Sequence, residues 1–284
     1  STAYDLALLM SAALQNPAFA DLTAQKSRTV DFVKPDDKRV TYYYAEGPQG
    51  LQSEPVASQH SLAFQEAGGV NVVEGVGVTA GGGPTHNCIA DLALYHAIPN
   101  LTVVVPADAA QCRKAVRASH SFQGPMVIRI DRAGMPAVYA DQDYDFEFGK
   151  AIETKEGSDL TLIATGSPTY WALMGAKMLE EQYHISVRVV DMHTIKPIDK
   201  DMIVKAAKET GNIVTVEEHS INGGLGSQVA EVLLEAGCGN VKFKRVGLPD
   251  EFAVLGETDA IYHYYGMDPE GICNTAAKLL DLKK

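Results

Sequence analysis

The chain has 284 residues, 46% of them hydrophobic, which is enough apolar material for about two buried cores. Its formal net charge is -12, and it has no basic run long enough to neutralise a line of phosphates, which argues against a nucleic-acid or anionic-membrane surface. Four scattered cysteines without a CxxC pair argue against a disulfide framework or a metal site and predict reduced, buried thiols. The sequence has no run of 18 apolar residues, so we expect no membrane span and a cytoplasmic location.

The first half of the chain alternates predicted helices and strands. Apolar residues at helical spacing predict a helix over residues 2–15. Further along, we expect strands over 70–73, 101–106 and 126–130, separated by helices over 88–96 and 109–120. This alternation predicts a parallel sheet with right-handed crossovers.

The second half repeats the alternation after an acidic, aromatic stretch over residues 139–147 that has neither helical nor strand periodicity. A strand over 160–164 leads through Ser167-Pro168 into a helix over 169–182, and the last helix is expected over 269–282. The predicted fold class is therefore α/β, with two three-layer domains and mainly parallel sheets. We expect domains over 1–138 and 157–284, joined by a linker over 139–156.

Two runs in the second half have a distinctive form. Residues 189–199 are an apolar, β-branched strand that ends at Pro197, and Asp199 is placed to cap the next helix. A strand over 212–217 then meets a helix over 227–235 at Asn222-Gly223-Gly224-Leu225-Gly226. A glycine-rich turn of this kind can bind phosphate, but tight packing is the favoured interpretation.

Taken together, these two runs resemble the C-terminal domain of transketolases. The first half resembles the pyrimidine-binding domain that precedes it in the same family, at residues 99–108 and at Ala45-Glu46, Gly83-Pro84-Thr85-His86 and Ile128-Arg129-Ile130-Asp131-Arg132. The order agrees with the separate C-terminal subunit of split transketolases. The resemblance implies thiamine-diphosphate-dependent transfer of a two-carbon ketol unit from a ketose phosphate to an aldose phosphate, as in pentose phosphate chemistry.

The resemblance also implies a partner. The family's Gly-Asp-Gly motif, which helps to hold Mg²⁺ and the diphosphate, is absent from the sequence. We therefore expect an N-terminal transketolase subunit that carries the diphosphate-binding domain and supplies most of the Mg²⁺ ligands. The active form should be a dimer of heterodimers, a heterotetramer.

The resemblance implies roles for several residues. Glu46 matches the acid that hydrogen-bonds the pyrimidine ring of the cofactor, although an Ala-Glu pair after a Tyr-rich strand also occurs by chance. His86 matches a catalytic histidine that contacts the substrate, and without its motif a helix cap or buried donor would be the better interpretation. Phe64 lies in the region of the pyrimidine-stacking aromatic residues. Arg132 matches the arginine that binds the sugar-phosphate end, and Arg129 competes for that role.

Two further histidines of the C-terminal runs, His193 and His219, are expected to be structural. His60 lies in the same region as Phe64 and is an equally open candidate for contact with the pyrimidine.

Departures from the family pattern keep other interpretations open. Gly81-Gly82 stands where the family has an acidic pair that contacts a substrate hydroxyl. Only residues 47–54 separate Glu46 from a strand expected over 55–59, and only 65–69 separate Phe64 from the next strand, which is short for parallel crossovers. Either the chain is a degenerate relative with a damaged cofactor pocket, or the printed sequence lacks internal residues.

Alternative functions are a deoxyxylulose-phosphate-synthase-like protein, a 2-oxo-acid dehydrogenase β-like subunit, and a noncatalytic transketolase-like scaffold that has lost the cofactor.

Overall fold

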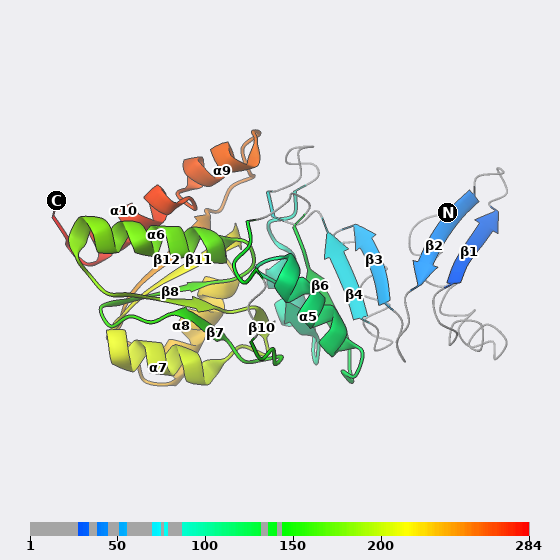
Figure 1. Ribbon diagram of the computed structural model, residues 1–284, viewed down its shortest axis with the longest axis horizontal. Helices are drawn as coiled ribbons and strands as arrows, with labels where there is room; N and C mark the ends of the chain where they lie inside the picture. Colours follow the sequence, from blue (N-terminus) through cyan, green and yellow to red (C-terminus); the bar gives the residue numbers. More distant parts are fainter. Residues whose placement is uncertain are drawn as a thin grey trace.

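The computed structural model describes part of the chain. The described residues are 28–33, 39–44, 51–55, 70–74, 77–78, 87–131, 136–140 and 144–283. Within them the chain forms a two-stranded antiparallel pair, β1 (Arg28–Val33) and β2 (Arg39–Tyr44), and two five-stranded sheets (Figure 1). The helix expected over 2–15 lies outside the described residues.

The first five-stranded sheet has the order β10-β5-β6-β4-β3. Its strands are β3 (Leu51–Pro55), β4 (Val70–Glu74), β5 (Thr102–Val104), β6 (Met126–Arg129) and β10 (Thr194–Lys196). Strands β3 to β6 run parallel, as predicted, and β10 pairs antiparallel with β5. The edge strand β10 comes from the second half of the chain, so backbone pairing joins the two halves.

Two helices sandwich this sheet. Helix α5 (Ala109–Ser119) begins at Asp108, whose carboxylate accepts from Gln111 N at 2.8 Å, and helix α4 is Asp91–Ala97. Alternate residues of β5 and β6 face the two helices, because successive side chains of a strand point to opposite faces. Val104 and Ile128 belong to the cluster around α5, whereas the α4 side contains Leu92, Tyr95, Val103 and Val127.

The second sheet has the order β12-β11-β8-β9-β7. Its strands are β7 (Ile152–Lys155), β8 (Leu160–Ala164), β9 (Val187–Asp191), β11 (Asn212–Ser220) and β12 (Lys242–Leu248). All pair in parallel except β7, which is antiparallel to β9. Strands β8 and β9 are buried along their whole length, as expected for a parallel sheet that is covered on both faces.

Helices cover both faces of the second sheet (Figure 1). Helices α6 (Pro168–Tyr183), α9 (Thr258–Tyr265) and α10 (Pro269–Leu279) share one apolar cluster. Helices α7 (Lys200–Thr210) and α8 (Leu225–Glu235) lie on the other face, and their cluster continues into α4 and β5 of the first unit. The α/β class with two three-layer units is therefore confirmed, and one core spans both.

The sequence placed several elements imprecisely. The strand expected over 55–59 lies instead at β3, directly parallel to β4, so residues 56–69 form the connection between two parallel neighbours. The expectation that a short connection would prevent this arrangement is wrong for this pair. The run over 189–199 contains two strands, not one: β9 ends at Asp191, and β10 joins the other sheet.

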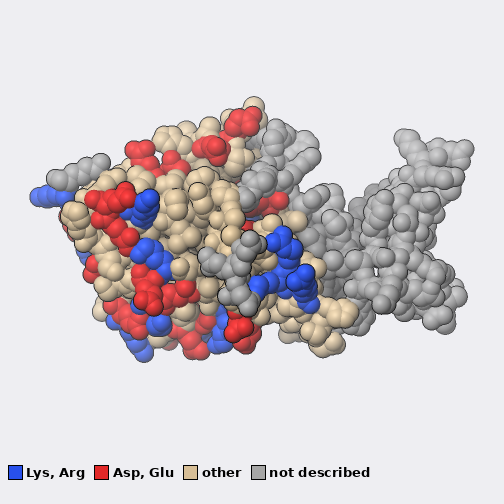
Figure 2. Space-filling model, viewed as in Figure 1, with Lys and Arg blue, Asp and Glu red and all other residues tan. Residues whose placement is uncertain are grey.

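Acidic and basic side chains are interspersed over much of the second unit, and basic side chains gather over α5 (Figure 2). Exposed ion pairs such as Lys200–Glu235 at 3.1 Å account for part of this mixture. Pairs of this kind contribute little stability because water screens them. None of the helices in the described part of the chain combines the length and apolar character needed to cross a membrane.

Candidate functional site

The four parallel strands of the first sheet end at one edge, which is where open α/β sheets place their ligands. Gly77 and Val78 follow β4 at this edge, and Asp131 follows β6. The segments that carry two predicted site residues, His86 and Arg132, start here. We therefore take this edge, together with the part of the second unit packed against it, as the candidate site.

Most residues predicted for the site lie outside the described part of the chain. These are Glu46, Phe64, His86 and Arg132, together with His60 and Gly81-Gly82. Their roles stay predictions. The described neighbours of His86 and Arg132 define the surroundings of the site.

Arg129 is the one predicted site residue that the structure describes. Its side chain is 3% exposed, and its Nε donates to Asp91 Oδ2 at 2.7 Å. Its Nη2 donates to Asp91 Oδ1 at 3.3 Å and to the Glu218 carbonyl oxygen at 3.1 Å. The guanidinium therefore links β6 to helix α4 and to β11 of the second unit, and a contact between Arg129 and substrate stays a prediction.

The second unit holds both described ends of the segment 79–86. The two ends pair with each other, since Gly77 N donates to the Cys88 carbonyl oxygen at 2.8 Å. Val78 N donates to the Glu218 carboxylate, and Ser220 N donates to the Ile89 carbonyl oxygen at 2.8 Å. The end of β11 thus fastens the base of the segment that contains Gly83-Pro84-Thr85-His86.

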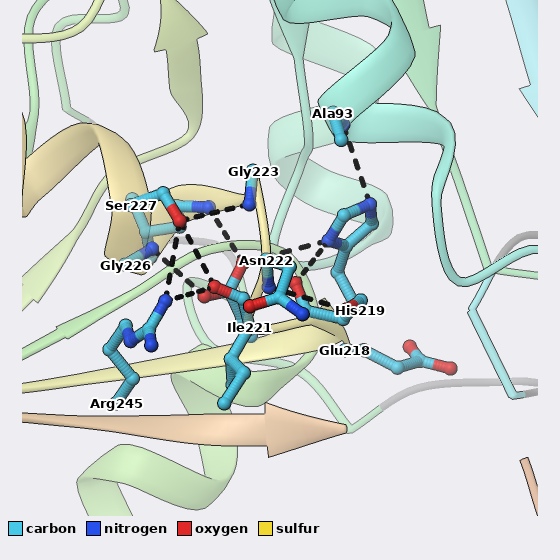
Figure 3. Close-up of polar contacts among 12 residues, drawn as sticks. Ala93, Glu218, His219, Ile221, Asn222, Gly223, Gly226, Ser227 and Arg245 are labelled. Atoms are coloured by element: carbon cyan, nitrogen blue, oxygen red, sulfur yellow. Dashed lines mark hydrogen bonds and ion pairs between the residues drawn. The ribbon is translucent and has the colours of Figure 1, made fainter. Parts of the chain in front are cut away.

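His219 caps helix α4 from the second unit. The residue before the helix, Ala90, makes no side-chain cap of its own. Instead, Ala93 N in the first turn donates to His219 Nε2 at 3.4 Å (Figure 3). His219 Nδ1 lies 2.6 Å from the Ser220 carbonyl oxygen, which can only accept, so Nδ1 carries the proton. Burial lowers the pKa of His219, which keeps the ring neutral and its Nε2 free to accept.

Glu218 points away from His219, to the opposite side of β11 (Figure 3). There its carboxylate meets Asp131, Ser167 and Tyr262, with Ser167 Oγ 3.4 Å from Glu218 Oε2 and 3.1 Å from Tyr262 Oη. Burial raises the pKa of Glu218 well above its usual range, and the nearby charge of Asp131 adds to the shift. Burial also raises the pKa of Asp131, which accommodates a shared proton between the two carboxyl groups.

The glycine-rich turn is a packing device, as predicted. The carboxylate of Glu217 occupies the start of helix α8, where it accepts from Leu225 N at 2.6 Å and from Gly226 N at 2.8 Å. A Cβ on Gly224 would lie 2.0 Å from Glu217 Oε2, and one on Gly223 would lie 2.7 Å from Ala93 Cβ. The helix terminus therefore already binds an anion that belongs to the chain itself.

A second buried carboxylate joins the two units beneath the site. Asp191, at the end of β9, accepts from Tyr139 Oη and from Gln111 Nε2, each at 2.6 Å. Asp108 accepts from the backbone N–H groups of Val138 and Tyr139 at 2.8 Å. Burial raises the pKa of Asp191 to about 7. The segment at Tyr139, expected to begin the linker, is thus fixed to both units.

The remaining expectations concern histidine and cysteine. His193 is buried, stacks on Phe146 with ring centroids 4.5 Å apart and pairs with Thr194 Oγ1 at 2.9 Å, which agrees with a structural role. The four cysteines are free, but Cys273 is the one that is fully buried, so the expectation of buried thiols is wrong for the other three. Among the described residues, no group of histidine, cysteine and acidic side chains could hold a metal ion.

Sequence reasoning missed Asp91, Asp131 and Glu218. The available signal was a charged residue within or next to a run predicted to be buried, because such residues are almost never buried unless they are paired. Glu217-Glu218 inside an otherwise apolar strand is the clearest case. Which partner each charge takes could not be deduced, because the pairing joins residues far apart in the sequence.

Family models match both halves of the chain. The model described as transketolase, pyrimidine binding domain, matches residues 56–137, and the model described as transketolase, C-terminal domain, matches residues 149–272. Glu46 precedes the matched residues, whereas His86, Arg129 and Arg132 fall within them.

Individual relatives agree with the models. One of the two subunits of an apulose-4-phosphate transketolase, from Phocaeicola vulgatus, is 43% identical over 198 residues, which make up 70% of this chain and 62% of the relative. A 1-deoxy-D-xylulose-5-phosphate synthase from Heliobacterium modesticaldum is 32% identical over 223 residues, 78% of this chain and 34% of the relative. The chain therefore spans less than two thirds of the length of either of these curated relatives.

Among solved structures, one described as a split gene transketolase, inactive beta4 tetramer, matches with a TM-score of 0.66 and 42% sequence identity. The match covers 76% of this chain and 67% of that one. With both domain models matched in order and this fold shared, the chain belongs to the transketolase family.

Proposed function

We propose that the chain is the C-terminal subunit of a thiamine-diphosphate-dependent transketolase, which acts together with an N-terminal subunit to transfer a two-carbon ketol unit from a ketose phosphate to an aldose phosphate. The observation that carries this proposal is the succession of a pyrimidine-binding match and a C-terminal match along one chain. Domains over 1–138 and 157–284, with a linker over 139–156, are part of the proposal.

The proposed partner is an N-terminal subunit that carries the diphosphate-binding domain and most of the Mg²⁺ ligands. The sequence contains no Gly-Asp-Gly motif, and the name of the relative from Phocaeicola vulgatus describes a transketolase subunit, not a whole enzyme. The relative described as a beta4 tetramer is called inactive, which favours the need for a second type of subunit. We propose a cytoplasmic dimer of heterodimers.

The candidate edge fits a polar ligand. Both carboxamide atoms of Asn87, the residue after His86, are buried, and neither has a hydrogen-bond partner among the described residues. A buried amide without partners is costly, so a bound group that hydrogen-bonds it would be stabilised. Thiamine diphosphate, when bound, would supply the carbon nucleophile that carries the two-carbon unit.

This chain's own residues would bind and orient. Glu46 would hold a proton on its carboxyl group and donate it as a hydrogen bond to the pyrimidine ring, and Phe64 would stack on that ring. His86 would hydrogen-bond the donor sugar as a neutral imidazole. Arg132 would bind the phosphate end through its planar fork, with Arg129 as the alternative. Gly81-Gly82 leaves a substrate hydroxyl without the acidic contact that is usual in the family, so the donor sugar would be an unusual one.

The test is ketol transfer by the chain mixed with its N-terminal partner, in the presence of Mg²⁺ and thiamine diphosphate. Apulose 4-phosphate, the sugar in the name of the relative from Phocaeicola vulgatus, and common ketose phosphates serve as donors. Transfer that needs both subunits and disappears in a His86→Ala variant would support the proposal. A folded complex without transfer from any donor would contradict it.

The same assay separates the alternatives. The match to a 1-deoxy-D-xylulose-5-phosphate synthase keeps a synthase-like activity as second candidate, and formation of 1-deoxy-D-xylulose 5-phosphate by the complex would favour it. Acyl transfer to a lipoyl-bearing partner would favour a 2-oxo-acid dehydrogenase β-like subunit. A complex that binds no cofactor would favour a noncatalytic scaffold.

A further inference from the structure

Three contacts converge on the base of segment 79–86. Gly77 pairs with Cys88 across the base, Val78 is bound by the carboxylate of Glu218, and Ile89 is bound by the backbone of Ser220. Two of the three come from the last turn of β11, which belongs to the second unit. Since Glu218 lies 140 positions from Val78 in the sequence, the contact is a specific tertiary device and not a local turn.

We propose that Glu218 is a positioning residue, whose carboxylate binds Val78 and thereby fixes the segment that carries His86 at the edge of the first sheet. The proposal rests on the proposed function, because it gives the second unit a part in ketol transfer. Glu218 itself need not touch the substrate.

The local structure allows the carboxylate an unusually close approach. A Cβ on Gly77 would lie 2.2 Å from Glu218 Oε1, so no other residue at position 77 leaves room for the carboxylate in its present place. Asp131 and Ser167 engage the same carboxyl group and fix its orientation. Its position is therefore set by the first unit through Asp131 and by the second unit through Ser167.

Arg129 reinforces the same base. Its guanidinium holds Asp91 in the first turn of α4 and the carbonyl oxygen of Glu218 at once. Glu218 therefore contacts the first unit through its side chain at Val78 and through its backbone at Arg129. A loss of reach at the Glu218 side chain would leave the backbone contact in place, which allows the role of the carboxylate to be tested separately.

Glu217 offers a matched control on the same strand. Its carboxylate is as buried as that of Glu218 but accepts hydrogen bonds from Leu225 and Gly226, within the second unit. Shortening either side chain should free the backbone amides that it binds. The amides of residues 77–78 should respond to Glu218 alone, and those of residues 225–226 to Glu217 alone.

The experiment is hydrogen–deuterium exchange of the full chain, with Glu218→Asp, Glu218→Gln and Glu217→Asp variants. Glu218→Asp keeps the charge but withdraws the carboxylate, so peptides covering 77–78 and 88–89 should exchange about tenfold faster or more, the equivalent of one charged hydrogen bond. Glu218→Gln keeps both the reach and an acceptor and should exchange like the wild type. Equal protection of residues 77–78 in Glu218→Asp and in the wild type would overturn the proposal.

Kinetics with the N-terminal partner provide the second measurement. Glu218→Asp should lower kcat about tenfold or more, with the KM for the sugar changed by less than about threefold, and Glu218→Gln should restore most of the loss. Faster exchange with unchanged kcat would overturn the positioning role and leave the proposed function standing. If the wild-type complex shows no transfer, the proposed function fails, and exchange still decides whether Glu218 fixes the segment.

Discussion

Glu218, in the last turn of β11, accepts a hydrogen bond from the backbone N–H of Val78, directly after the turn that follows β4. The contact joins the two α/β units at the edge where the first sheet should bind its ligand. Both ends of α4 are held in a similar way. His219 accepts from Ala93 at the start of the helix, and Lys196 Nζ donates to the His96 carbonyl oxygen at 2.8 Å at its end. The second unit therefore determines how the site helix sits.

Substitution of Gly77 should be costly for two separable reasons. Its φ of +63° disfavours any residue with a Cβ, and the Cβ would collide with Glu218. Gly211 has a φ of +65° and nothing within 4 Å of its would-be Cβ, so Gly211→Ala measures the backbone strain alone. We expect Gly77→Ala to lower the free energy of unfolding in urea by at least about 1 kcal/mol more than Gly211→Ala. Equal losses would show that the close approach of Glu218 has no energetic weight.

The buried Asp91–Arg129 pair should be strongly asymmetric in its response. Asp91→Leu leaves a buried guanidinium without its counter-charge, which should cost about 3–5 kcal/mol. Replacing both partners, as Asp91→Leu with Arg129→Met, should cost less than Asp91→Leu alone, because no charge is then left uncompensated. The exposed Lys200–Glu235 pair is the control, and Glu235→Gln should change stability by less than about 0.5 kcal/mol. The measurement is urea unfolding of all four proteins, and a double variant less stable than the single one would contradict this account.

Stability should fall as pH rises towards neutrality, because of Asp191. Burial raises its pKa to about 7 in the folded chain, above its value in the unfolded chain, so the folded state binds the proton more tightly. Between about pH 4 and pH 7 the free energy of unfolding should therefore decrease by up to about 1.4 kcal/mol per pH unit from this group. Asp191→Asn removes the titration and should flatten that part of the profile. A variant whose profile is as steep as that of the wild type would assign the slope to other groups.

Much of the fold could be predicted because buried parallel strands leave a strong signal. The strand over 160–164 was placed correctly, since five apolar or β-branched residues lie between charged or polar turns. The run over 189–199 shows the limit of that signal. An apolar run indicates burial but not which sheet it enters, and here Met192 and His193 separate a strand of the second sheet from one of the first.

The site was predicted less completely than the fold. Glu46, His86, Phe64 and Arg132 came from motifs in the sequence, and they remain predictions. The charged contacts around Glu218 depend on tertiary pairing between the two units, and no local pattern specifies them. A charged residue in a buried strand announces that a partner exists, but its identity follows only from the folded structure.

The central claim is that this chain forms half of a thiamine diphosphate site. Its most direct test is calorimetric titration of thiamine diphosphate with Mg²⁺ into the chain copurified with its N-terminal partner, with a Glu46→Ala complex as control. The account predicts saturable binding by the wild-type complex and a loss of at least about tenfold in affinity on substitution, because a buried hydrogen bond to the cofactor ring is removed. No binding by a well-folded complex would contradict it.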